Sequence, residues 1–151
     1  MFAVIHRNRL ILSSLFAAVV LIAVIVGVYS LDNKTNTTVV NYIQSYGWEI
    51  TREPVEISHL TIPTDFDPVY TAYNELLGES GFDLSLYKGK KVSRYTYRVL
   101  NHTTEHRTPY APQTVLANVM VCENSIIGAD ISSDGVNGFI HTINDIEQII
   151  K

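Results

Sequence analysis

The sequence predicts an α+β protein, in which a single N-terminal transmembrane helix precedes a small domain with helices packed on an antiparallel sheet. Three observations lead to this prediction. The run from Leu10 to Leu31 carries no charge, and the segment 66–77 repeats apolar residues with helical spacing. Later segments alternate as strands do, and Glu123-Asn124 forms a compact turn between two of them.

The uncharged run is long enough to cross a bilayer. As a helix that rises about 1.5 Å per residue, Leu10 to Leu31 spans roughly 30 Å, the thickness of the hydrocarbon core. Arg7 and Arg9 precede the run, so the positive-inside rule places the N-terminus in the cytoplasm and the following domain outside. The run exceeds the usual signal-peptide core, which favours a retained signal anchor. Cleavage near Ser30 stays an alternative and would give a secreted form.

The predicted organisation is a cytoplasmic head at 1–9, a transmembrane helix at 10–31, a tether at 32–36 and an extracytoplasmic α+β domain at 37–151. Two of the eleven basic residues lie in the head, so the rest of the chain holds nine Lys and Arg against fifteen Asp and Glu, a net charge of −6. This acidic balance argues against binding to nucleic acid. Cys122 is the single cysteine, which excludes an internal disulfide.

The domain is expected to begin with a short helix and an irregular strand. Asn36 or Thr37 can cap the helix, which ends before the strand. Alternation of apolar and polar residues predicts a half-buried strand over 48–57 that runs on loosely to Ile62. Pro54 cannot donate a ladder hydrogen bond, so this strand belongs at a sheet edge or contains a bulge.

A second helix has the clearest signals of the domain. Asp65 or Asp67 can cap it, Pro68 is tolerated in its first turn, and Gly78 ends it. Its predicted apolar face comprises Phe66, Val69, Tyr70, Tyr73, Leu76 and Leu77. This face is expected to cover a sheet built from 91–101, 114–122 and 125–131, followed by a Gly-rich turn, Phe139-Ile140 and a short helix with Ile143, Ile146, Ile149 and Ile150.

Several segments of the domain resemble a known protein family. They are Ser45-Tyr46-Gly47-Trp48-Glu49, Asp65-Phe66-Asp67-Pro68-Val69-Tyr70, Tyr73-Asn74-Glu75-Leu76, Gly81-Phe82-Asp83-Leu84, Tyr87-Lys88-Gly89-Lys90, Arg94-Tyr95-Thr96-Tyr97-Arg98-Val99, Ile127-Gly128-Ala129-Asp130 and Gly138-Phe139-Ile140-His141. The chain resembles an uncharacterised family of small bacterial proteins, found mostly in Gram-positive anaerobes, with an N-terminal membrane segment and a domain of unknown function. The resemblance implies no catalytic residue, ligand or partner.

A second resemblance concerns the fold. The segment Gly89-Lys90-Lys91-Val92 before a Tyr-rich strand, then 117–122, a turn and 126–131, is similar to the strand ending of PepSY-type domains. The resemblance implies one helix on an antiparallel sheet, a PepSY-type or cystatin-like arrangement. PepSY-type domains are commonly extracytoplasmic and have been linked to restraining peptidases or to sensing. A shared fold does not by itself imply a shared function.

Three groups of residues are candidates for catalytic or metal sites. His102 and His106, with Glu105 between them, have a spacing that would suit one metal on a helix, but neighbouring prolines favour a solvated loop. Cys122 could be a nucleophile, although it lies at a strand end without a flanking catalytic motif. The acidic residues Asp65, Asp67 and Asp83 lie near turns but lack the spacing of a calcium loop, and Asp65 and Asp67 are interpreted as residues at a helix start. We therefore predict no catalytic residue, no metal ligand and no cofactor.

The candidate interaction face comes from the strand at 91–101, where Arg94 and Arg98 alternate with Tyr95 and Tyr97. The arginines point to one side with Lys90 or Lys91 nearby, which suits either an anion site or the solvated face of a sheet. The tyrosines point to the other side, and their spacing, like that of Tyr42, Tyr46, Tyr70 and Tyr73, favours core or rim positions over a binding groove.

The sequence favours a non-enzymatic binding module held at the membrane by one helix. Its partner would be an envelope protein or peptide, bound through the sheet face or the edge that bears Pro54. The alternative is an envelope hydrolase or metal-dependent enzyme, which would need a nucleophile with a base, or a metal, in a cleft. The sequence has no Gly-x-Ser-x-Gly, His-Glu-x-x-His or Ser-x-x-Lys pattern, which counts against this alternative.

Overall fold

A computed structural model describes residues 18–24, 34–103, 114–134 and 138–146. The chain divides into two compact units, Met1–Thr35 and Asn36–Lys151. In the first unit, residues 18–24 are helical and exposed, and most of the predicted transmembrane run at 10–31 lies outside the described residues. Within the described ranges, no helix is both long and apolar enough to cross a membrane.

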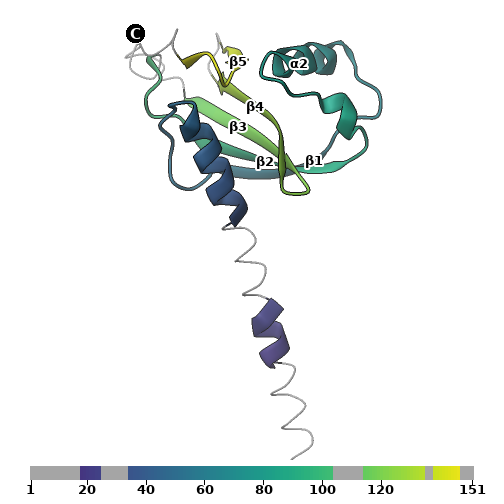
Figure 1. Ribbon diagram of the computed structural model, residues 1–151, viewed down its shortest axis with the longest axis vertical. Coiled ribbons are helices and arrows are strands. Elements are labelled where there is room, and N and C mark those ends of the chain that lie inside the picture. Colours follow the sequence, from purple (N-terminus) through teal and green to yellow (C-terminus); the bar gives the residue numbers. More distant parts are fainter. Residues whose placement is uncertain (1–17, 25–33, 104–113, 135–137, 147–151) are drawn as a thin grey trace, which may run out of the picture. The chain divides into compact units, whose positions relative to one another are not determined.

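The second unit contains a five-stranded antiparallel sheet with the order β1-β2-β3-β4-β5 (Figure 1). Its strands are β1 (Glu56–Thr61), β2 (Lys91–Arg98), β3 (Val115–Cys122), β4 (Ser125–Ser133) and β5 (Ile140–Thr142). The three predicted central strands are thus confirmed. Glu123 and Asn124 join β3 to β4 with φ of 49° and 69°, the two positive angles that a tight hairpin turn requires. The α+β class with helices on an antiparallel sheet is confirmed as well.

Two segments before the sheet differ from the prediction. Residues 34–45 are helical, so the predicted tether at 32–36 is helical from residue 34 and Asn36 lies inside the helix instead of capping it. The predicted strand at 48–57 is wrong over most of its length, because only Ile50 forms a bridge, to Val99, and β1 begins at Glu56. Pro54 lies just before this edge strand, so its lack of an N–H group removes no hydrogen bond from the ladder.

One face of the sheet carries the larger part of the core. Val39 and Ile43 of the helix at 36–45 pack there with Trp48 and with alternate residues of β2, β3 and β4. These strand residues are Tyr95, Tyr97, Val115, Ala117, Val119, Val121, Ala129 and Ile131. The Trp48 Nε1–H donates to the Ile143 carbonyl at 2.8 Å. This hydrogen bond joins the segment that follows the helix at 36–45 to the segment that follows β5. This face therefore unites residues that are far apart in the sequence.

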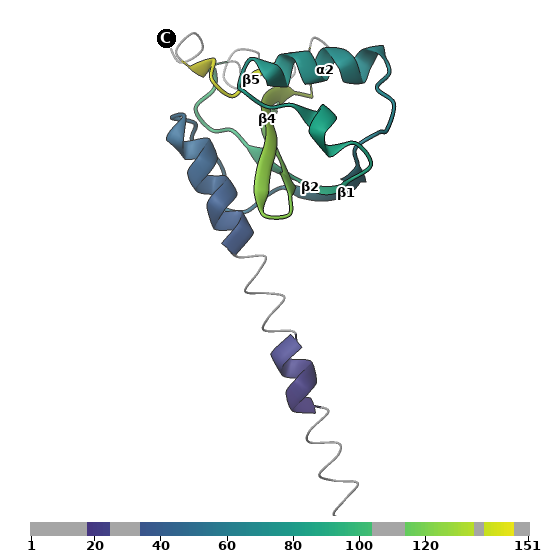
Figure 2. The same cartoon turned by 45° about the vertical axis from the view of Figure 1, so that its right-hand side comes forward.

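The opposite face is covered by α2 (Pro68–Gly78) and the 3-10 helix η1 (Leu84–Tyr87), as Figures 1 and 2 show. As predicted, Asp67 caps α2: its carboxylate accepts the Tyr70 N–H at 2.7 Å. The buried side of α2 is narrower than predicted. Leu77 is fully buried and Tyr73 is half-buried, whereas Val69 is 76% exposed.

A β-bulge in β4 shapes the surface under α2. Met120 is opposite Gly128 and Val121 is opposite Ile126, which leaves Ile127 as the extra residue. Ile127 is fully buried in the cluster beneath α2. Gly128 lies so close to the helix that a β-carbon there would be 3.0 Å from Leu77 Cδ1 and 2.9 Å from Met120 Cε. The absence of a side chain at this position lets α2 approach the sheet.

Gly128→Ala should therefore destabilise the domain by about 1–3 kcal/mol, the usual cost of overpacking a core. Gly78→Ala is the matched control, because a β-carbon at Gly78 has no heavy atom within 4 Å and the residue lies in α2. The control should stabilise the domain by about 0.4–1 kcal/mol. Urea unfolding measures both changes. Gly128→Val is the stricter variant, because a shift of the Met120 methyl group can make room for one carbon but not for a branched side chain that also meets Leu77. Equal stability of the Gly128→Val variant and the wild type would contradict the close approach of α2.

Candidate functional site

A chain of hydrogen bonds crosses the sheet face beneath α2. The Tyr73 hydroxyl donates to Asp130 Oδ2 at 2.7 Å, and the Asn118 side-chain amide donates to Asp130 Oδ1 at 2.9 Å. The same amide nitrogen also donates to Ser132 Oγ at 2.9 Å, and Thr96 Oγ1 donates to Asn118 Oδ1 at 3.0 Å. These bonds join one helix and three strands, so they fix the position of α2 relative to the sheet.

Asp130 is a carboxyl group almost removed from solvent, with 3% of its surface exposed. Burial raises its pKa, and the hydrogen bonds from Tyr73 and Asn118 together with the charge of Arg94 oppose this rise without cancelling it. The pKa of Tyr73 is also raised, first by its own burial and then by the charge of Asp130. The pair therefore favours a neutral Tyr73 that donates its proton in a hydrogen bond.

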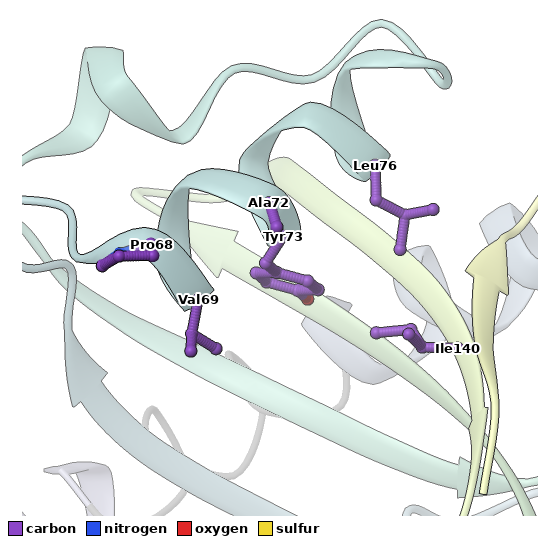
Figure 3. A pocket seen from close by; sticks show the side chains of 6 residues that line it. All are labelled: Pro68, Val69, Ala72, Tyr73, Leu76 and Ile140. Carbon is purple, nitrogen blue, oxygen red and sulfur yellow. The ribbon is translucent and has the colours of Figure 1, made fainter.

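Beside this pair lies an apolar groove of about 670 Å³, shown in Figure 3. It is lined by Pro68, Val69, Ala72, Tyr73 and Leu76 of α2 and by Ile140 of β5. Leu76 and Ile140 approach the space from opposite walls, and the Tyr73 ring lies between Val69 and Leu76. None of the lining residues carries a charge, and the hydroxyl of Tyr73 is engaged by Asp130. The groove can therefore receive an apolar group.

The predicted interaction face does not form one surface. Tyr95 and Tyr97 are buried in the core of the first face, so they cannot contact a partner. Arg94 is half-buried on the side of α2, and Arg98 is exposed on the same side of β2 four residues farther along. The arginines and the tyrosines lie on opposite faces because neighbouring residues of a strand alternate in direction, as the sequence predicts. Of the two lysines expected beside the arginines, Lys90 pairs with Glu123 at 3.2 Å and Lys91 is exposed.

Neither His102 nor Cys122, which were candidates for a metal ligand and a nucleophile, lines the groove. His102 is buried in a stack of rings, 5.0 Å from Phe139 and 6.0 Å from Trp48 between centroids, and His141 also belongs to the stack. His106 and Glu105 lie outside the described residues. Cys122 is buried in the cluster under α2. Across the described ranges, no group of three or more His, Cys, Asp and Glu residues could hold a metal ion.

The acidic and aromatic candidates near the helix starts have structural contacts. Asp67 caps α2, and Asp83 accepts the Ser85 N–H at 2.9 Å at the start of η1. Asp65 instead accepts a hydrogen bond from the Thr64 hydroxyl at 3.3 Å. Tyr42 and Tyr46 stack edge to face at 5.2 Å at the rim of the core. These residues therefore have a role in the fold, as the sequence predicted for Asp67 and for the tyrosines.

Sequence reasoning missed both the groove and Asp130. Asp130 was part of a predicted strand, and no local signal distinguishes a buried aspartate from a solvated one. The groove depends on Ile140, which reaches α2 only because β5 pairs with β4. The available signal was the width of the apolar stripe in α2, since Val69 and Leu76 extend it beyond the residues that the sheet buries.

The raised pKa of Asp130 makes the stability of the domain depend on pH. The folded state holds this proton more tightly than the unfolded state, so the contribution of Asp130 to stability is present below the unfolded pKa of about 3.9 and is lost as the pH rises through the folded value. The stability of the wild type relative to Asp130→Asn should therefore fall as the pH rises above about 4 in urea unfolding, the unfolded value of the carboxyl pKa. Asp65→Asn controls for the loss of an exposed carboxylate. A wild-type advantage that grows with pH would contradict the assignment.

Comparisons with known proteins place the chain in a family. The family model described as Domain of unknown function (DUF4830) matches residues 42–131, which is more than half of the chain and includes β1, α2, β2, β3 and β4 as far as Ile131. No curated protein and no solved structure matches the chain. The match agrees with the expected membership in an uncharacterised family with a domain of unknown function. This chain belongs to the DUF4830 family.

Proposed function

We propose that this protein is a membrane-tethered, extracytoplasmic interaction module that binds an apolar segment of an envelope protein or peptide in the groove between α2 and β5. The observation that carries the proposal is the groove itself. Its side chains are apolar, and two of them, Val69 and Ile140, are 76% and 49% exposed. Exposed apolar surface that is gathered in one concavity is typical of binding sites.

The proposed location rests on the N-terminal sequence. The uncharged run at 10–31 has the length of a membrane span, and the arginines before it favour a cytoplasmic N-terminus. One helix in the bilayer would then hold the α+β domain at the outer surface of the cell membrane. A form released by cleavage near Ser30 would carry the same groove into the surrounding medium.

The geometry supports binding more than hydrolysis. Cys122 and His102 are both buried, in clusters on opposite faces of the sheet, so they do not form a nucleophile and base. Asp130 faces Tyr73 and Asn118, and both of its oxygens accept hydrogen bonds from these side chains. A groove wall without charge favours desolvation of an apolar partner, which is the main driving force of such binding.

A charge in the groove wall should abolish partner binding. Val69→Asp places a carboxylate where the bound segment would have to bury it, which costs several kcal/mol, and about 1.4 kcal/mol is tenfold in affinity. Leu86→Asp is the matched control, because Leu86 is also 76% exposed but lies in η1 and does not line the groove.

The measurement is crosslinking in intact cells, followed by affinity purification of the full-length protein from detergent-solubilised membranes and mass spectrometry. The wild type and Leu86→Asp should recover the same stoichiometric partner, and Val69→Asp should recover at least tenfold less. Recovery of the partner with Val69→Asp at the wild-type level would remove the groove from the proposal.

A further inference from the structure

Arg94 carries a positive charge into the layer between the sheet and α2. Its side chain is half-buried on the face of β2 that is turned toward α2, and its Nε atom is shielded from solvent. Among the described residues, none accepts a hydrogen bond from this Nε–H, and none forms an ion pair with the guanidinium. A buried charged donor without an acceptor is rare in native proteins, so the position of this side chain points to a ligand.

The residue opposite Arg94 on β1 has the same property. Ser58 and Arg94 are direct partners in the antiparallel pair of β1 and β2. Side chains in such a pair lie on one face with their β-carbons about 5 Å apart. The Ser58 Oγ atom is also buried, and no described residue forms a hydrogen bond with it. Two adjacent side chains from different strands therefore offer donors that the described part of the fold does not use.

Helix α2 brings a third donor to this place. Burial raises the pKa of Tyr70, and the positive charge of Arg94 opposes the rise, so the two side chains interact through space. The Tyr70 hydroxyl has no hydrogen bond to the described residues, whereas that of its neighbour Tyr73 donates to Asp130. The raised pKa keeps Tyr70 protonated. Its proton is therefore available to an acceptor that binds at Arg94.

The local charge favours a ligand with a single negative charge. Arg98 is the next arginine on this face of β2, and at four residues of spacing along a strand it lies about 13 Å away. Arg94 alone therefore compensates one anionic charge, and a doubly charged anion such as phosphate would keep an unpaired charge in a half-buried place. A carboxylate suits the site, because the Nε–H and one Nη–H of a planar guanidinium match its two oxygens.

We propose that Arg94, Ser58 and Tyr70 bind a carboxylate, whose two oxygens accept hydrogen bonds from the guanidinium and from the two hydroxyls. The carboxylate belongs to a small free acid or to the C-terminus of a peptide, since both present the same group. The site and the groove lie on the same face of the sheet, but none of these three residues lines the groove. The carboxylate site therefore does not depend on the proposed function.

NMR titration of the isotope-labelled full-length protein in non-ionic detergent tests the site. The Nε–H resonance of Arg94, identified by its loss in Arg94→Lys, should move downfield and saturate with sodium acetate and with N-acetylalanine at constant ionic strength. The neutral analogues acetamide and N-acetylalaninamide should leave the resonance unchanged. Tighter binding of acetate would assign the site to a free acid, and tighter binding of N-acetylalanine would assign it to a peptide terminus.

Variants followed by the backbone amide resonances of β1 and β2 give a second test. Arg94→Gln should weaken acetate binding at least tenfold, and Ser58→Ala, which removes one donor, about threefold or more. Arg98→Gln is the matched control, because Arg98 is an exposed arginine of the same strand and face, and its affinity for acetate should stay within about twofold of the wild type.

Four results would each overturn the proposal. They are the absence of a saturable shift with both carboxylates, an equal shift with their neutral analogues, tighter binding of inorganic phosphate than of acetate, and an equal loss of affinity in Arg94→Gln and Arg98→Gln. The wild-type titration decides the first three without any substitution near the core.

Discussion

The hydrogen bond from Tyr73 to Asp130 is the constraint on which the arrangement around α2 depends. The helix packs on the sheet through few side chains, with Leu77 against the gap left by Gly128. Apolar contacts are not directional, whereas a short hydrogen bond to a buried carboxyl requires one position of the Tyr73 hydroxyl. Because the bond fixes Tyr73, it also fixes the position of the groove that Tyr73 lines.

The two faces of the sheet explain why a small domain can bury its strands without a disulfide. The helix at 36–45 covers one face and α2 covers part of the other, so β3 is buried along almost its whole length. The bulge in β4 gives α2 an additional anchor by turning Ile127 toward it. The groove is the part of the second face that α2 leaves uncovered on the side of β5.

The sequence predicted correctly the helix start and the hairpin turn, which depend on interactions between residues close together in the chain. The Asp67 cap, the Pro68 start and the turn at Glu123-Asn124 each follow from backbone groups within a few residues, and the structure confirms all three. The strand predicted over 48–57 is absent before Glu56 except for one bridge, and Trp48 at its start donates a hydrogen bond to the Ile143 carbonyl, a contact that no local pattern encodes. The alternation of apolar and polar residues in that segment accompanies a single bridge between Ile50 and Val99. The regular pairing with β2 begins only at Glu56.

The candidate site was beyond sequence reasoning for a related reason. Its parts come from α2, β4 and β5, and they meet only when the register of the sheet is known. The sequence nevertheless marked α2 as important, because it contains more apolar side chains than one buried stripe needs. The arginines of β2 were predicted to share a face, and they do, but the tyrosines between them belong to the core.

Amide hydrogen exchange of full-length Tyr73→Phe tests most directly whether the bond to Asp130 holds α2 in place. The change leaves Asp130 Oδ2 without its donor, a loss of about 1–3 kcal/mol, so amides of α2 should exchange roughly tenfold faster or more. Amides of β3 should keep their protection. Tyr70→Phe is the matched control, since Tyr70 lies in the same helix and its hydroxyl has no hydrogen bond to the described residues. Unchanged exchange in α2, or the same change in both variants, would contradict the account.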